Sequence, residues 1–131
     1  MIAYSIVIPT YGRNDFLGNC LESIEAQILK PKDVFIIDNN NDFNINKNVE
    51  NIIKNFHSND INFNYHKGAI NSGAVARNHG ASLVSTELVA FLDDDVLLDN
   101  DYYQKIVDVY KNNTDVVGVQ GVDRSLIESY I

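Results

Sequence analysis

The sequence predicts an α/β fold with a mainly parallel central sheet. Short apolar runs alternate with amphipathic helical patterns along the chain, and polar residues follow several of the apolar runs. Strands that are separated by helices form βαβ units, whose strands run parallel and whose crossovers are right-handed. The 131 residues suit one domain with its own core, and the pattern contains no internal repeat or linker.

Two strands and two helices are expected in the first half of the chain. Ser5–Ile8 is a β-branched run that Pro9 ends, and Val34–Ile37 is a second run that Asp38 closes. Between these strands, residues at helical spacing should face the sheet: Leu17, Cys20, Leu21, Ile24 and Ile28. The polar stretch 39–48 predicts a loop. A second helix should follow, marked by Val49, Ile52, Ile53 and Phe56.

The second half of the chain continues this alternation. Apolar and polar residues alternate over 61–65, as in a strand with one covered face. Gly73–Ser85, rich in alanine and other small residues, predicts a third helix, and Leu88–Leu92 is a fully apolar strand. The spacing of apolar residues over 102–110 predicts a fourth helix, and Val116–Val119 predicts a fifth strand.

Polar segments follow three of these strands. They are Thr10–Asn14 after the first strand, Asp38–Asn41 after the second and Asp93–Asp95 after the fourth. Ligands of open parallel sheets bind beyond the carboxyl ends of the strands, and these ends lie at one edge of the sheet. We therefore expect the three segments to converge on one site.

The run Asp93–Asp95 is the sharpest of these features. Consecutive carboxylates at the end of an apolar strand repel one another and are costly to desolvate, and a divalent cation would offset both costs. In an extended segment Asp93 and Asp95 would face one site, while Asp94 would face elsewhere. Oxygen-only ligands suit Mg²⁺ or Mn²⁺. The alternative is a solvated acidic loop, but the apolar strand directly before the run favours a site.

The other polar residues at this edge allow two interpretations each. Thr10 and Tyr11 could hold a nucleobase by hydrogen bonding and stacking, or could belong to an ordinary strand-to-helix turn. Asp38 could accept hydrogen bonds from a base or a ribose, or could make a turn with Asn39. Arg77, in the third helix, could meet a phosphate or lie on the surface.

Composition excludes several classes of function. The net charge of −8 argues against non-specific nucleic-acid binding, which needs basic patches facing phosphates. It leaves room for a diphosphate that a divalent cation bridges to carboxylates. No apolar run approaches the roughly 20 residues that cross a bilayer, and no signal-peptide pattern is evident. The single cysteine, Cys20, excludes an internal disulfide and favours a cytoplasmic location.

Taken together, the segments resemble those of the family 2 glycosyltransferases, up to about Gly121. The matching pieces occur in the family's order: Ser5–Arg13, Leu21–Ile24 with Gln27, Val34–Asp38, Gly73–Gly80 and Phe91–Asp95. The resemblance implies a Rossmann-like GT-A three-layer sandwich with a mainly parallel central sheet. It also implies that residues 1–131 form a single nucleotide-sugar-binding domain that stops before the family's acceptor-binding half.

The resemblance also implies a set of residues that bind the nucleotide sugar: Pro9, Thr10, Tyr11, Arg13, Asp38, Asn39, Arg77, Asp93 and Asp94. Residues 9–11 would form the wall around the base. Asp95 would ligate the Mn²⁺ or Mg²⁺ ion, and Asp93 would hold the ribose or help with the metal. Asn39 replaces a second aspartate that is frequent in the family, which leaves the nucleotide preference open, although a UDP-type donor is expected.

The reaction that the resemblance implies is metal-dependent, inverting transfer of a sugar from a nucleoside diphosphate to an acceptor hydroxyl. The acceptor would be a saccharide or a lipid-linked molecule in polysaccharide or glycoconjugate synthesis, and peripheral association with the inner membrane face stays open. No general base is identifiable. The main alternative is a non-catalytic nucleotide-sugar-binding module that acts with a partner chain. A sugar nucleotidyltransferase ranks lower, because residues 10–14 lack a glycine-rich basic loop.

Overall fold

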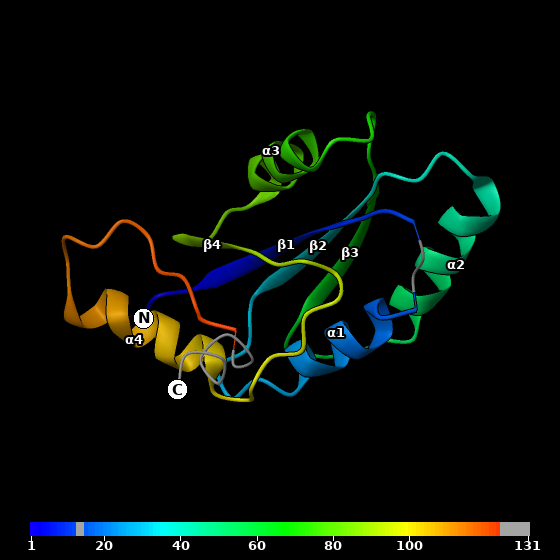
Figure 1. The fold of residues 1–131 in the computed structure, drawn as a ribbon. Helices are drawn as coiled ribbons and strands as arrows, with labels where there is room; N and C mark the ends of the chain where they lie inside the picture. Colours follow the sequence, from blue (N-terminus) through cyan, green and yellow to red (C-terminus); the bar gives the residue numbers. More distant parts are fainter. Residues whose placement is uncertain (13–14, 124–131) are drawn as a thin grey trace.

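A computed structural model describes residues 1–12 and 15–123, and these residues form four strands and four helices (Figure 1). In chain order the elements are β1 Tyr4–Thr10, α1 Leu17–Glu25, β2 Asp33–Asp38, α2 Phe43–Lys54, β3 Asn62–Lys67, α3 Gly73–Leu83, β4 Leu88–Phe91 and α4 Tyr102–Asn112. The strands form one sheet in the order β3-β2-β1-β4, and every pair is parallel. The predicted α/β class and parallel sheet are confirmed.

The sheet is the middle of three layers. Helix α3 covers one face, while α1, α2 and α4 lie on the other (Figure 1). Successive strand residues point to opposite faces, so β1 contributes to both cores. Val7 packs with Ala76 under α3, whereas Ile6 and Ile8 pack against the opposite helices. These three β1 side chains are fully buried, and each such burial stabilises the fold by roughly 1.5–3 kcal/mol.

Helix α3 approaches the sheet closely because its inner face carries small residues. A Cβ atom at Gly80 would lie 2.2 Å from Cγ1 of Val7, and Ala76 is 1% exposed. Real Cβ atoms do not approach other heavy atoms so closely, so the backbone of α3 depends on glycine at this point. The alanine-rich pattern of Gly73–Ser85 is therefore explained by packing against β1.

Three details of the sequence prediction are wrong. Val116–Val119 is not a strand: these residues follow α4 without ladder pairing, and Val117 is 98% exposed. The loop after β2 is shorter than expected, because Asp42 caps α2 by accepting hydrogen bonds from the backbone N–H groups of Asn44 and Ile45. Ile28 is 69% exposed rather than facing the sheet, because α1 ends at Glu25.

Candidate nucleotide-sugar site

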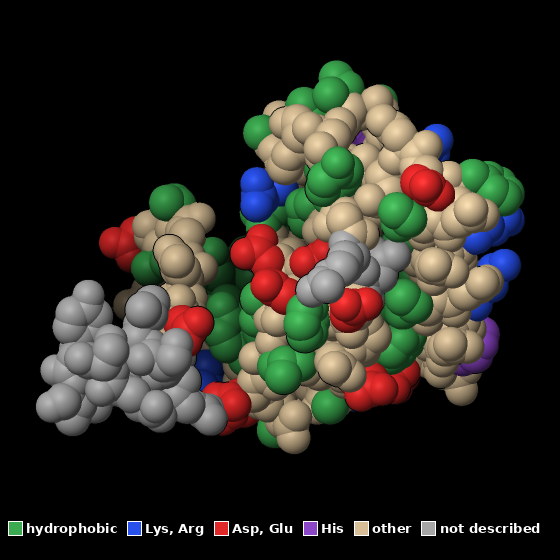
Figure 2. All heavy atoms as spheres, turned by 45° about the vertical axis from the view of Figure 1, so that its right-hand side comes forward, with side chains coloured by type: hydrophobic (Ala, Val, Ile, Leu, Met, Phe, Trp, Pro, Cys, Tyr) green, Lys and Arg blue, Asp and Glu red, His purple; other side chains and the backbone are tan. Residues whose placement is uncertain are grey.

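The carboxyl ends of β1, β2 and β4 meet at one edge of the sheet. Thr10 at the end of β1 is in register with Asp38 at the end of β2. The Thr10 hydroxyl donates a hydrogen bond to the Asp94 carboxylate after β4, with 2.6 Å between the oxygens. Figure 2 shows acidic side chains gathered on this part of the surface, with a basic side chain next to them. The predicted convergence of three polar segments is therefore observed.

The segment Asp93–Asp95, hereafter the acidic turn, does not continue the strand. Strand β4 ends at Phe91, and the backbone turns at Asp94 and Asp95. The backbone N–H of Val96 donates to the carbonyl of Asp93 over 3.4 Å. We expected Asp93–Asp95 to be extended, so that strand alternation would direct Asp93 and Asp95 to one side. That expectation is wrong, because the segment is a turn.

Asp94 is the anchored member of the acidic turn. Its side chain is half-buried and accepts the hydrogen bond from Thr10. Burial raises the pKa of Asp94, the Thr10 hydrogen bond opposes this, and the charges of Asp95 and Asp93 raise it further. Asp94 thus ties the acidic turn to β1.

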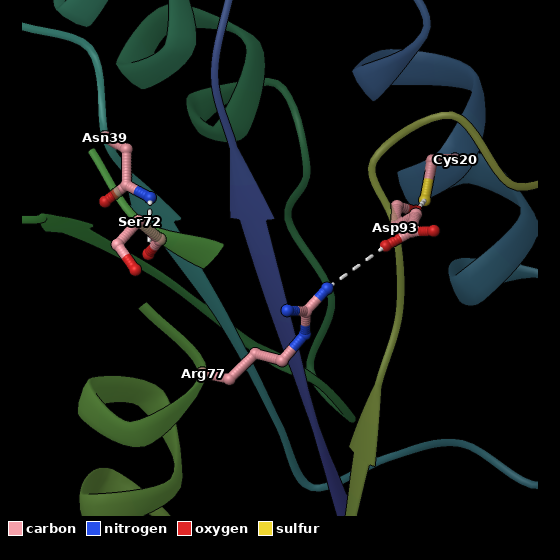
Figure 3. Close-up of polar contacts among 5 residues, drawn as sticks. All are labelled: Cys20, Asn39, Ser72, Arg77 and Asp93. Atoms are coloured by element: carbon pink, nitrogen blue, oxygen red, sulfur yellow. Dashed lines mark hydrogen bonds and ion pairs between the residues drawn. The ribbon is translucent and has the colours of Figure 1, made fainter. Parts of the chain in front are cut away.

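Asp93 and Asp95 are exposed, in contrast to Asp94. The Asp93 carboxylate lies 3.7 Å from Nη2 of Arg77, which reaches across from α3 (Figure 3). Both side chains remain open to water, at 70% exposed for Asp93 and 45% for Arg77. An exposed ion pair at this distance contributes at most about 1 kcal/mol, so a ligand can replace either partner at little cost.

Helix α1 contacts the acidic turn through Cys20. The thiol of Cys20 is fully buried and donates to the Asp93 carbonyl over 3.7 Å (Figure 3). Burial, followed by the charge of Asp94, raises the pKa of Cys20 to about 12, so the thiol stays protonated and can act as this donor. Gln27 is 1% exposed and donates to the carbonyl of Asp99 over 2.7 Å, which fixes the chain beyond the turn.

Asp38 is fully buried and accepts four hydrogen bonds from the chain itself. Asn40 donates from its backbone N–H at 3.0 Å and from Nδ2 at 2.7 Å. Nδ2 of Asn46 donates at 2.7 Å and the Tyr65 hydroxyl at 2.8 Å. We call Asp38, Asn40, Asn46 and Tyr65 the Asp38 cluster. These four donors fill the capacity of both carboxylate oxygens, and the bond from the backbone N–H of Asn40 closes a turn at Asp38. A direct contact with a nucleotide stays a prediction.

Sequence reasoning missed the three partners of Asp38. Asn40 and Asn46 belong to a polar stretch that was expected to be a plain loop, and Tyr65 was assigned to the covered face of its strand. The available signal was the aspartate itself, because a carboxylate at the end of a fully buried strand needs several donors nearby.

Asn39 is enclosed by the connection between β3 and α3. It is 5% exposed, and its Nδ2 lies 3.4 Å from the carbonyl oxygen of Ser72 (Figure 3). Its Oδ1 is buried without a hydrogen-bond partner among the described residues. A Cβ at Gly68 would lie 2.2 Å from that oxygen, so any larger residue at this position would force the Asn39 amide to shift.

The connection after β1 presents Tyr11 at the surface of the site. Tyr11 is 59% exposed, whereas Thr10 before it is buried and Gly12 after it is half-buried. Gly12 has a positive φ of 80°, and its N–H donates to Oδ1 of Asn40 over 2.9 Å. Pro9 is half-buried at the end of β1, and Arg13 lies outside the described residues.

The acidic turn meets the chemical requirements of a magnesium or manganese site that substrate completes. Among the described residues, no group of three or more His, Cys, Asp or Glu side chains could hold a metal by itself. Mg²⁺ commonly binds through one or two carboxylates, with phosphate oxygens and water supplying the remaining ligands. The exposed carboxylates of Asp93 and Asp95 fit that requirement.

The fold is that of GT-A glycosyltransferases. A crystal structure of Staphylococcus aureus TarS, residues 1–349, matches 95% of this chain and 39% of its own chain with a TM-score of 0.69 at 21% identity. The same TarS fragment in complex with UDP-GlcNAc matches 95% of this chain and 38% of its own with a TM-score of 0.68 at 22% identity. The Rossmann-like GT-A three-layer sandwich is thereby confirmed.

The chain belongs to glycosyl transferase family 2, whose family model matches residues 5–129. It is 29% identical over 125 residues to the glucosyl-dolichyl phosphate glucuronosyltransferase of Haloferax volcanii, over 89% of this chain and 37% of that protein. It is also 29% identical over 130 residues to the poly(ribitol-phosphate) β-N-acetylglucosaminyltransferase TarP of S. aureus, over 93% of this chain and 38% of TarP. The chain therefore spans well under half the length of these relatives.

Within the described residues, no helix is long and apolar enough to span a membrane.

Proposed function

We propose that this chain binds a UDP-type nucleotide sugar and that the protein transfers the sugar, with inversion, to an acceptor hydroxyl. The observation that carries the proposal is the acidic turn, whose anchored Asp94 leaves the exposed carboxylates of Asp93 and Asp95 beside Arg77. The UDP and UDP-GlcNAc complexes of TarS, a protein of the same fold, support a ligand of this class.

The diphosphate would be held from two sides. Asp93 and Asp95 would hold a Mg²⁺ or Mn²⁺ ion, which when bound stabilises negative charge on the departing diphosphate. Arg77 would turn its guanidinium from Asp93 to a phosphate oxygen, which it can contact through two N–H groups. The weak ion pair between Arg77 and Asp93 keeps both groups close by until the ligand arrives.

The nucleobase would lie against the exposed ring of Tyr11. Aromatic rings stack on bases without regard to sequence, and each such contact contributes about 1–3 kcal/mol. Pro9 and Thr10 would complete that wall, since they precede Tyr11 at the end of β1. Asn39 is enclosed by the β3–α3 connection, with only its Nδ2 hydrogen-bonded, so we assign Asn39 to shaping the wall around the base.

The transfer step needs a base that removes the proton of the acceptor hydroxyl. The acceptor oxygen forms a bond to the anomeric carbon, the bond to the diphosphate oxygen breaks, and its electron pair leaves with UDP. For the whole protein we propose a saccharide or a lipid-linked molecule as the acceptor, together with such a base.

Isothermal titration calorimetry with UDP, with and without Mn²⁺, tests the binding half of the proposal. We expect the wild type to bind UDP in the presence of Mn²⁺ and Asp95→Asn to bind at least about tenfold more weakly, a loss of about 1.4 kcal/mol. Asp115→Asn, at another exposed aspartate beyond α4, is the matched control and should bind like the wild type. Absence of UDP binding, or equal affinity of Asp95→Asn, contradicts the assignment.

A further inference from the structure

Asn40 connects a buried carboxylate to the loop that carries Tyr11. Its Nδ2 donates to Asp38 over 2.7 Å, and its Oδ1 accepts from the backbone N–H of Gly12 over 2.9 Å. Asn40 is 3% exposed, so its side chain is shielded from water, and its bond to Asp38 is buried. The side chain therefore joins the end of β2 to the connection that follows β1.

The chemistry of the two partners suits an amide at this position. The Asp38 carboxylate accepts only, and the Gly12 N–H donates only, so the bridging side chain must donate on one branch and accept on the other. An aspartate in place of Asn40 would put a second carboxylate against Asp38, and an alanine would leave both partners unbridged. The orientation of the Asn40 amide is thus fixed by its neighbours.

The rest of the Asp38 cluster holds Asn40 in place. The backbone N–H of Asn40 donates to Asp38, and Nδ2 of Asn46 donates both to Asp38 and, at 3.0 Å, to the Asn40 carbonyl. Burial, and then the hydrogen bond to Asp38, raises the pKa of Tyr65, so its hydroxyl remains a donor. A satisfied buried network of this kind is rigid and can serve as a fixed point for a loop.

The loop is fixed on both sides of Tyr11. On one side, the Thr10 hydroxyl is bound to Asp94 of the acidic turn. On the other side, the Gly12 N–H is bound to Asn40, and the positive φ of Gly12 turns the chain there. Tyr11 lies between these two bonds with its side chain exposed. The Asn40 bond therefore restrains the backbone on one side of Tyr11.

We propose that Asn40 is a positioning residue for nucleotide binding, which acts by fixing Gly12 so that Tyr11 is held ready to stack on the base. This inference rests on the proposed function and extends it, because Asn40 itself would not touch the ligand. A ring held in place before binding loses less conformational freedom when the base arrives, which raises affinity.

The test compares two probes by calorimetry in the presence of Mn²⁺: UDP, and inorganic diphosphate, which lacks a base. We expect Asn40→Ala to bind UDP about tenfold more weakly, the scale of one well-placed hydrogen bond, and to bind diphosphate like the wild type. Asn48→Ala, at an exposed position of α2, is the matched control and should leave both affinities unchanged. Equal losses for UDP and diphosphate would indicate general damage and overturn the proposal.

A double-mutant cycle asks whether Asn40 acts through Tyr11. If it does, Tyr11→Ala weakens UDP binding strongly in the wild type and much less in Asn40→Ala, so the two effects are not additive. Additive effects overturn the proposal. If the wild type binds no UDP, the proposed function fails and this inference with it. If the wild type binds UDP and Asn40→Ala binds it equally well, only the inference fails.

Two further measurements guard against a variant that does not fold. In the wild type, hydrogen exchange at the Gly12 N–H should be slow for a loop, and in folded Asn40→Ala it should become fast.

If Asn40→Ala does not fold, Gly12→Ala replaces it in the cycle. Its Cβ meets no atom of the described residues within 4 Å, but the φ of 80° disfavours alanine, so the loop shifts while the Asp38 cluster stays complete. The same selective loss of UDP affinity is expected.

Discussion

Asp38 ends one strand of the sheet and the acidic turn follows another at the same edge, and yet their surroundings are opposite. Asp38 is fully buried, and the chain itself supplies four hydrogen-bond donors. Asp93 is 70% exposed, and its Arg77 partner lies at 3.7 Å. The protein itself fills the acceptor positions of Asp38, whereas the carboxylate of Asp93 is open to solvent and accessible to a ligand. Position after a strand therefore does not by itself assign function.

The largest expected effect separates these two roles directly. Asp38→Ala should lower the free energy of unfolding by about 3–5 kcal/mol, because it leaves the donors of Asn40, Asn46 and Tyr65 buried without an acceptor. Asp93→Ala should change that free energy by no more than about 0.5 kcal/mol, as is usual for exposed positions. Urea unfolding followed by circular dichroism measures both. Similar losses for the two variants would remove the distinction between buried and exposed strand ends.

A smaller loss of unfolding free energy is expected for a substitution at Gly68, which lies against Asn39 next to Asp38. Gly68→Ala would place a Cβ atom 2.2 Å from Oδ1 of Asn39 and 3.3 Å from the Asp38 carbonyl oxygen. Overpacking of this kind costs typically about 1–3 kcal/mol, and Asn39 is too enclosed to move aside freely.

Gly118→Ala is the matched control for this glycine prediction. Within the part of the chain that the structure describes, a Cβ at Gly118 meets no atom within 4 Å, so the unfolding midpoint of Gly118→Ala in urea should stay near that of the wild type. If Gly68→Ala is as stable as Gly118→Ala, the connection around Asn39 is looser than its burial indicates.

The contrast between the two strand ends also explains what the sequence could predict. The apolar patterns predicted all four strands of the sheet. Because these strands are parallel, the patterns also predicted the edge at which Thr10 contacts Asp94. Both follow from local patterns and from general rules for parallel sheets. Which aspartate is buried depends on partners far along the chain, such as Tyr65, which lies 27 residues beyond Asp38. Such partners have no local signature.

The incorrect fifth strand has a related cause. Val116–Val119 is apolar and β-branched, which favours a strand, but a strand also needs a neighbour that supplies its ladder hydrogen bonds. In the described residues these positions are not paired with β4, and Val117 is 98% exposed. Propensity alone was therefore insufficient here.

The smallest expected effect concerns the Arg77 ion pair at the open strand end. Arg77→Ala should change the free energy of unfolding by no more than about 0.5 kcal/mol, because both side chains are solvated and the pair is long. Lys105→Ala is a suitable control, since its pair with Asp101 is also exposed, at 3.1 Å. Urea unfolding at low and high salt should give nearly the same small differences for both variants. A loss of more than about 1 kcal/mol for Arg77→Ala alone would mean that Arg77 holds the acidic turn in place, as the Asp38 cluster holds the end of β2. Arg77 would then be needed for the structure of the turn, and its release to a phosphate would be costly.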